Sequence, residues 1–366
     1  MRRVNDPAGD ARIGFMPAEM LLRQYRPRCA AKLRCTSVAR PRFPVIDAHN
    51  HLGCLLPGVP TSGGWHLRPV RELLEVMDEA GVSMIVDLDG QWDDALEREL
   101  DRYSRAYPER FAVFAGVDYD LMGQRRDFGS VLAARLRRGV AAGARGLKVC
   151  KWLGLRARDP DGRLIAPDDR RLDELWAAAG ELGVPVLIHV ADPVAFFQPL
   201  DEYNERWEEL VAHPDWHFHG PGFPAFDALI DALEALVARH PRTTFITAHV
   251  GCNAEDLDRV SAMLQRYPNM YSDISARLAE LGRKPYSSRE FFVRHADRLL
   301  FGTDMRVDAE TYRIHYRFLE TRDEYFHYGP GDIPAQGRWM IYGLGLPDDV
   351  LRKVYSDNAR RLLKLC

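Results

Sequence analysis

The sequence is poor in cysteine and contains no Cys-x-x-Cys pair, since six thiols are spread over 366 residues. A chain of this length can bury a sizeable core without disulfide bonds, so we expect the cysteines to be reduced. The start of the chain also lacks an apolar signal core, because Asn5, Asp6 and Asp10 interrupt it. Both absences indicate a cytoplasmic protein.

Long hydrophobic runs and an excess of one charge are missing as well. The longest apolar stretches, such as residues 82–86 and 184–190, are far shorter than the roughly 20 residues that cross a bilayer. The formal net charge is −3, with 50 basic and 53 acidic residues mixed along the chain. The short apolar runs exclude a membrane protein, and because no large basic surface is expected, nucleic acid is excluded as a partner.

What remains is the composition of a globular protein, with 46% hydrophobic and 28% charged residues. Residues 1–42 are rich in Arg, Pro and Ala and are predicted to form an N-terminal arm, with one short helix near 17–24. Residues 43–366 are predicted to form a single catalytic domain. The arm would suit subunit exchange in a homo-oligomer, either a dimer or a tetramer.

Short runs rich in Val and Ile alternate with helical periodicity after residue 45, which is typical of buried parallel strands and their crossover helices. Strands are predicted over 45–48, 84–88, 112–117, 146–150, 186–190, 244–248, 270–274 and 299–302. Helices are predicted over 70–80, 93–107, 130–142, 171–182, 224–239, 254–267, 288–295 and 309–320, with a C-terminal helix over 347–365. Eight such strands favour an α/β fold of the (β/α)8 TIM-barrel type, although a doubly wound sheet shows the same local pattern.

The segment 191–223 is long for a loop and is rich in aromatic residues. In a barrel it would lie over the mouth, where substrate pockets form.

Histidines and one aspartate follow the predicted strands. His49 and His51 close the first strand, and the His-x-His spacing places both imidazoles on one side of an extended chain. This pair alone could also be two unrelated histidines. However, His189, His249 and Asp304 also terminate apolar strands, and carboxyl ends of barrel strands converge on one face. The convergence predicts a metal site.

These motifs together resemble the amidohydrolase superfamily, and within it the amidohydrolase-related (amidohydrolase 2) branch of metal-dependent hydrolases and decarboxylases. The resemblance extends from about residue 43 to the C-terminus. The segments that carry it are VIDAHNHL (45–52), IH (188–189), AHVG (248–251), LFGTD (300–304) and NARRL (358–362).

The resemblance implies that His49, His51, His189 and Asp304 ligate a divalent ion. It implies that His249 either binds a second ion or acts beside the metal-bound water as an acid/base group. Lys148 stands where binuclear members carry a carboxylated lysine, and the alternative is an unmodified lysine that pairs with a carboxylate or binds a substrate acid group. We expect one ion rather than two, and Zn²⁺ first, although such ligands also accept Mn²⁺ and Fe²⁺.

A metal-bound water would let Asp304 take a proton and return it to the leaving group. Asp47 either orients a histidine or caps the turn. Lys151, Trp152, Arg277 and Arg306 are candidate substrate-binding residues, and for each a surface or packing role fits equally well.

Two further sets of residues could line the pocket. His217 and His219 are candidates with the same alternative. Cys54, Cys150 and Cys252 follow strand ends, and we expect them to be buried thiols rather than nucleophiles.

The first functional hypothesis is a metal-dependent hydrolase that cleaves an amide, lactam, lactone or related bond in a small molecule. The alternative is a non-oxidative decarboxylase of a small aromatic or unsaturated acid, although the glycine-rich run that family decarboxylases often carry after the His249 position is missing. A third hypothesis is a metal-binding barrel without catalytic activity, which the retained Asp304 disfavours.

Overall fold

The computed structural model describes residues 20–21, 25, 27–53, 68–329, 333–334 and 336–365. The chain divides into two compact units, Met1–Arg34 and Cys35–Cys366. The described residues of the first unit contain no helix or strand, and the helix expected near 17–24 lies largely outside the described residues. Part of the expected arm belongs to the second unit, where the Thr36 hydroxyl donates to Asp323 (2.7 Å) and the Arg42 amide donates to Glu320 (3.0 Å).

Eight short parallel strands form the centre of the second unit. They are β1 (Val45–Asn50), β2 (Val82–Asp87), β3 (Phe111–Val113), β4 (Leu147–Val149), β5 (Val186–Ile188), β6 (Phe245–Thr247), β7 (Met270–Asp273) and β8 (Leu299–Leu300). Neighbours in sequence are neighbours in space, in the runs β1-β2-β3 and β4-β5-β6-β7-β8. All eight strands predicted from the sequence are confirmed, most of them shorter than expected.

Backbone hydrogen bonds join the two runs of strands into a ring. Beyond β3, Ala115 forms a parallel bridge with Leu147, and the Lys148 amide donates to the Ala115 carbonyl (2.7 Å). At the other seam, the Ala48 amide of β1 donates to the Phe301 carbonyl beyond β8 (2.9 Å). The predicted TIM barrel is therefore confirmed.

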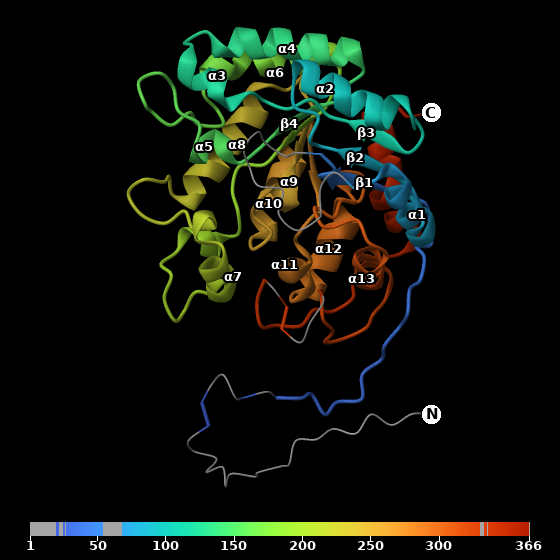
Figure 1. Ribbon diagram of the computed structural model, residues 1–366. Coiled ribbons are helices and arrows are strands. Elements are labelled where there is room, and N and C mark those ends of the chain that lie inside the picture. Colours follow the sequence, from blue (N-terminus) through green and yellow to red (C-terminus); the bar gives the residue numbers. More distant parts are fainter. Residues whose placement is uncertain are drawn as a thin grey trace, which may run out of the picture. The chain divides into compact units, whose positions relative to one another are not determined.

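Helices surround the strands, with α2, α4 and α6 on one side of them in Figure 1 and α10, α12 and α13 on the other. The longer ones are α1 (Val70–Ala80), α2 (Asp93–Glu99), α4 (Phe128–Ala142), α6 (Asp173–Leu182), α8 (Phe226–Arg239), α10 (Leu257–Arg266), α12 (Pro285–Arg294) and α13 (Ala309–Glu320). Helix α2 continues as a π-helix over Leu100–Arg105, and a 3₁₀ turn over Arg170–Leu172 precedes α6. All eight crossover helices predicted from the sequence are confirmed.

Helix α1 illustrates why these segments are helical. Leu73, Met77 and Ala80 recur at helical spacing and are all buried, and Gly81 ends the helix with φ 76°, a left-handed conformation that favours glycine.

Several short elements were not expected from the sequence. These are α3 (Tyr119–Gln124), α5 (Trp152–Leu155), α9 (Ala248–Gly251) and α11 (Leu278–Gly282). The aromatic segment after β5 was expected to be a loop, which is wrong in part. It contains a 3₁₀ turn (Val194–Phe197), α7 (Trp207–Ala212) and a second 3₁₀ turn (Pro214–Trp216). The Asn204 side chain stabilises this segment by donating to the Ala195 and Pro199 carbonyls.

The barrel interior is packed with apolar side chains. Ile46, Val86, Leu187 and Ile246 belong to an inner cluster that also contains Ala359 and Leu363 of the C-terminal segment. That segment comprises α14 (Asp348–Arg352), a π-helix (Lys353–Asp357) and α15 (Asn358–Leu363), which confirms the predicted C-terminal helix with a π-turn in it. Within the described residues, no helix is both long and apolar enough to cross a membrane.

Candidate metal centre

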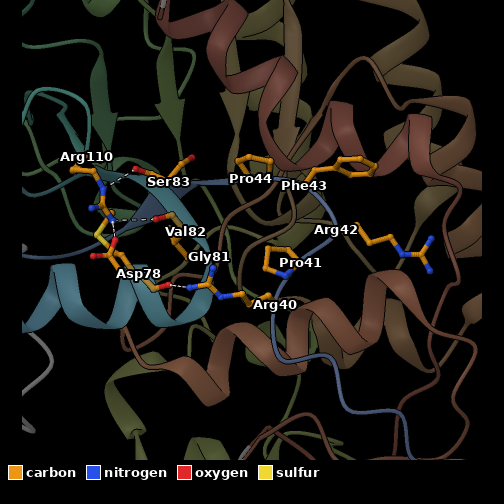
Figure 2. A pocket seen from close by; sticks show the side chains of 11 residues that line it. Arg40, Pro41, Arg42, Phe43, Pro44, Asp78, Gly81, Val82, Ser83 and Arg110 are labelled. Atoms are coloured by element: carbon orange, nitrogen blue, oxygen red, sulfur yellow. Dashed lines mark hydrogen bonds and ion pairs between the residues drawn. The ribbon is translucent and has the colours of Figure 1, made fainter.

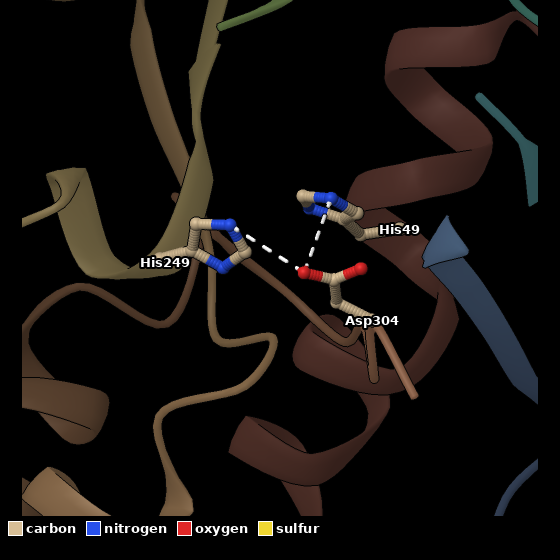
Figure 3. A group of neighbouring side chains, drawn as sticks. All are labelled: His49, His249 and Asp304. Carbon is tan, nitrogen blue, oxygen red and sulfur yellow. Dashed lines mark ion pairs between the residues drawn. The ribbon is translucent and has the colours of Figure 1, made fainter. Parts of the chain in front are cut away.

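Three histidines and one aspartate meet at the carboxyl ends of β1, β6 and β8. Asp304 Oδ2 lies 3.9 Å from His49 Nε2 and 3.6 Å from His249 Nε2, as Figure 3 shows. Asp304 Oδ1 lies 3.5 Å from His51 Nε2. His49 and His249 are almost fully buried, whereas the Asp304 side chain is 21% exposed. The four side chains form a buried centre that opens at the carboxylate.

The other ring nitrogen of each histidine contacts an oxygen acceptor. His49 Nδ1 lies 2.9 Å from Asp273 Oδ2, and His51 Nδ1 lies 2.6 Å from Asp89 Oδ1. His249 Nδ1 lies 3.0 Å from the Ser275 carbonyl, which can only accept. These partners place the proton on Nδ1 in all three rings, so each Nε2 carries a lone pair.

The three lone pairs face a carboxylate, an arrangement that favours a cation between them. Burial lowers the pKa of His49 and of His249 well below the ordinary value, so both imidazoles are neutral at pH 7. Burial also raises the pKa of Asp304, against the opposing effect of His51 and Lys148. Within the described part of the chain, His49, His249 and Asp304 form a group whose ligand atoms lie within 4.8 Å of one another. This donor set fits a divalent metal ion.

Lys148 of β4 reaches the same centre. Its Nζ lies 3.0 Å from His49 Nε2, and the side chain is buried. An ammonium group there donates to the imidazole and brings a positive charge, but it cannot ligate a metal. The position is compatible with both roles considered from the sequence, and the carboxylated form remains a prediction.

His189 follows β5 and lies beside this group rather than within it. Its ring packs edge-on against the ring of His249 at 4.4 Å, while its Nε2 lies 3.1 Å from the Ala191 carbonyl and 3.4 Å from Asp192 Oδ1. Burial lowers its pKa to about 4, although Asp192 acts to raise it. In this orientation Nδ1 is the ring atom left with a lone pair, and the role of His189 as a ligand stays a prediction.

The candidate substrate residues are dispersed around the mouth. Lys151 Nζ pairs with Asp192 (2.5 Å) and lies over the rings of Trp216 and Phe218. Trp152 is half-buried against Tyr119.

Two arginine candidates differ in burial. Arg306 is exposed, whereas Arg277 is 4% exposed and directly precedes α11. His217 is half-buried and His219 is exposed, and both contact backbone carbonyls of the aromatic segment.

Sequence reasoning missed the two carboxylates that hold the imidazoles. Asp273 is the last residue of β7 and Asp89 follows β2, so the rule that polar groups at strand ends converge would have found both. Asp47, by contrast, fastens the turn: its Oδ2 accepts from the Thr303 and Tyr312 hydroxyls (2.7 and 2.9 Å). It contacts no imidazole in the described structure.

The thiols beside the centre are poor nucleophiles. Burial raises the pKa of Cys150 and of Cys252 to about 11, so both are protonated at neutral pH. Cys54 lies outside the described residues.

A pocket of about 590 Å³ lies away from this centre (Figure 2). Its lining includes Phe43 and Pro44 before β1, and Val82 and Ser83 at the start of β2. It is therefore at the amino-terminal ends of these strands and contains none of the candidate ligands. Arg110 in its wall is already paired with Asp78 (2.8 Å).

One of two sequence comparisons places this chain among known proteins. The sequence model of a family described as amidohydrolase matches residues 46–365. A search of curated proteins finds no match.

Similar solved structures include three enzymes. The 2,6-dihydroxybenzoate decarboxylase from Rhizobium is 19% identical, with a TM-score of 0.56 over 88% of this chain and 99% of that chain. A dihydroxybenzoic acid decarboxylase from Polaromonas sp., solved with manganese and an inhibitor, is 16% identical, with a TM-score of 0.58 over 88% and 97%. The 5-carboxyvanillate decarboxylase from Sphingomonas paucimobilis is 15% identical, with a TM-score of 0.52 over 88% and 99%. At these identities, the likeness bears on the fold alone.

Proposed function

This chain belongs to the amidohydrolase family, and we propose that it is a metal-dependent hydrolase that cleaves an amide, lactam, lactone or related bond in a small molecule. The observation that carries the proposal is the convergence of the Nε2 atoms of three histidines on the carboxylate of Asp304. We propose one Zn²⁺ ion, held by His49, His51 and Asp304 together with either His189 or His249. A divalent ion in such a site lowers the pKa of its bound water to about 7 and polarises a carbonyl group.

The residues of the chain have distinct tasks in this reaction. Asp304 accepts the proton of the attacking water and returns it to the leaving nitrogen or oxygen, a role that its partial exposure and raised pKa support. Asp273 and Asp89 keep His49 and His51 in the tautomer that presents Nε2. His249, whose Nδ1 proton is held by the Ser275 carbonyl, presents Nε2 to the same centre and would either complete the ligand set or stand beside the bound water.

The test combines metal analysis with a substrate panel. We expect about one divalent ion per chain purified without chelator, and no added CO₂ on Lys148 in native intact mass. Amides, lactams and lactones are then assayed with the wild type, Asp304→Asn and the exposed control Asp227→Asn. We expect Asp304→Asn to lower kcat by roughly 10²- to 10⁴-fold and the control to match the wild type. Full hydrolysis by metal-free protein would contradict the proposal.

Decarboxylation is the second candidate, and the charge at the centre favours it. Lys148 and Arg277 are both buried cations near Asp304, and a substrate acid group would compensate them. Solved structures with this fold include decarboxylases, one of them with bound manganese. Release of CO₂ from dihydroxybenzoates, with no hydrolysis of the neutral panel, would replace the first proposal with this one.

A further inference from the structure

Arg277 occupies a position beside the metal centre that the strand ends fix. It follows Ala276, whose amide donates to the Thr303 carbonyl next to Asp304 (3.0 Å). Ala276 has φ 52°, a left-handed conformation that is unfavourable for a residue with a side chain. Arg277 follows this turn and directly precedes α11, four residues after the end of β7.

The guanidinium of Arg277 is buried but incompletely hydrogen-bonded. Its Nε is buried and has no partner among the described residues, and its Nη1 donates to the Ala276 carbonyl (3.0 Å). Buried guanidinium donors are normally satisfied, because an unpaired one loses its hydration without compensation. Such an atom beside a catalytic centre indicates a place for a ligand.

The neighbouring carboxylates balance the charge of Arg277 without binding it. Its charge acts on Glu209, Glu255 and Glu280, and also on Asp304 and His249 of the centre.

Each of these three glutamates has another partner. Arg206 pairs with Glu280 and, at 2.8 Å, with Glu209, while Glu255 accepts from the Val194 amide. Within the described residues, no carboxylate lies within ion-pair distance of Arg277.

The other cations at the centre are engaged. Lys151 pairs with Asp192, and Lys148 contacts His49. We propose that Arg277 binds a carboxylate group of the substrate, so that the enzyme acts on small molecules that carry a carboxylate in addition to the bond that is broken. The planar guanidinium matches a carboxylate with two parallel hydrogen bonds, which a lysine cannot offer. The inference rests on the proposed function for the identity of the reaction, and it assigns the substrate class.

Calorimetric titration of the full-length, metal-containing protein with benzoate and with benzamide tests the assignment, because the two ligands share a shape and differ in charge. The variants are Arg277→Met, which removes the charge, and Arg277→Lys, which keeps the charge but lacks the two parallel donors of a guanidinium. Arg283→Met is the control for general electrostatics, since Arg283 lies at the end of α11 and pairs with Glu205. Metal content and circular dichroism are measured on every sample.

We expect Arg277→Met to weaken benzoate binding about tenfold or more and Arg277→Lys to weaken it several-fold, with benzamide binding unchanged in both. Arg283→Met should bind benzoate as the wild type does. If Arg277→Met does not fold, the comparison of Arg277→Lys with the wild type decides. Equal benzoate affinity in the wild type and the folded Arg277 variants, or no benzoate binding by the wild type, would overturn the assignment.

The same samples separate this inference from the proposed function. A protein that holds a metal and hydrolyses the neutral panel, yet binds benzoate independently of Arg277, refutes only the inference. A protein without metal or hydrolysis, in which benzoate binding still depends on Arg277, refutes only the proposed function.

Discussion

His49 can ligate a metal through Nε2 only when its ring proton is on Nδ1, and Asp273 determines that position. Asp273 Oδ2 accepts from His49 Nδ1 (2.9 Å). Its Oδ1 accepts from the amides of His249 and Ser275 and from the Ser275 hydroxyl (3.0, 3.1 and 2.5 Å). In Asp273→Asn, the amide oxygen must stay on the side with three donors. The new NH₂ group then faces His49 Nδ1 and requires it to accept.

An accepting Nδ1 moves the ring proton to Nε2, where it points at Asp304 and removes the lone pair from the centre. Loss of such a partner typically weakens metal binding by about 10- to 100-fold, which corresponds to roughly 1.4 to 2.7 kcal/mol. We expect the upper part of this range, because the substitution reverses the tautomer rather than only loosening the ring. Competition with a chromogenic chelator measures the change in affinity.

A matched control separates tautomer control from loss of stability. Asp323 is as buried as Asp273 and also accepts several hydrogen bonds, from Thr36 and Arg317, but lies away from the centre. Asp323→Asn should lower the melting temperature and leave metal affinity unchanged. If Asp273→Asn binds the metal as tightly as the wild type, the tautomer argument is wrong.

Three further predictions concern stability and reactivity. Burial lowers the pKa of His315 to about 4, so the unfolded chain binds more protons than the folded protein between pH 6.5 and 4. The free energy of unfolding should therefore fall by up to about 3 kcal/mol as the pH falls through this window. His315→Leu should flatten this pH dependence in thermal melts. Arg206→Met removes the ion-pair partner of Glu280 and Glu209 and should lower the free energy of unfolding in urea by about 3–5 kcal/mol. An unchanged unfolding midpoint would show that these two ion pairs do not stabilise the protein. Cys150 and Cys252 should resist iodoacetamide at pH 7.5 in the folded protein, as mass spectrometry would show, and rapid inactivation by alkylation of either would contradict this.

The barrel could be predicted because its determinants are local. Runs of Val and Ile with helical segments between them encode strands and crossover helices, and a strand end is marked by the polar residue that follows it. His49, His249 and Asp304 came together for that reason, since topology brings strand ends to one face.

The orientation of each ring could not be predicted, because it depends on residues remote in sequence. Asp273 is 224 positions from His49, and nothing in either local sequence signals the hydrogen bond between them. His189 likewise follows its strand as expected, but Asp192 and the Ala191 carbonyl turn its Nε2 away from the three-residue group. Helix α7 was not predicted for the same reason. Its segment is held by the Asn204 side chain and by the ion pair of Glu208 with the remote Arg338, rather than by a helical pattern of apolar residues.

Backbone strain and the geometry of the centre are coupled at the strand ends. Nine described non-glycine residues have positive φ, and five of them lie in the segments that follow β6, β7 and β8: His249, Val250, Cys252, Ala276 and Asp304. Each costs about 1–3 kcal/mol, so the surrounding structure must impose it.

Hydrogen bonds between neighbouring strand ends impose these strained conformations. Asp304 donates from its amide to the His49 carbonyl (2.8 Å), and His249 donates from its amide to Asp273 (3.0 Å). The bonds that close the ring from β8 to β1 therefore also set the distance between His49 and Asp304. It follows that the ligands converge only in the closed barrel, and a change that loosens this seam would weaken metal binding before it unfolds the chain.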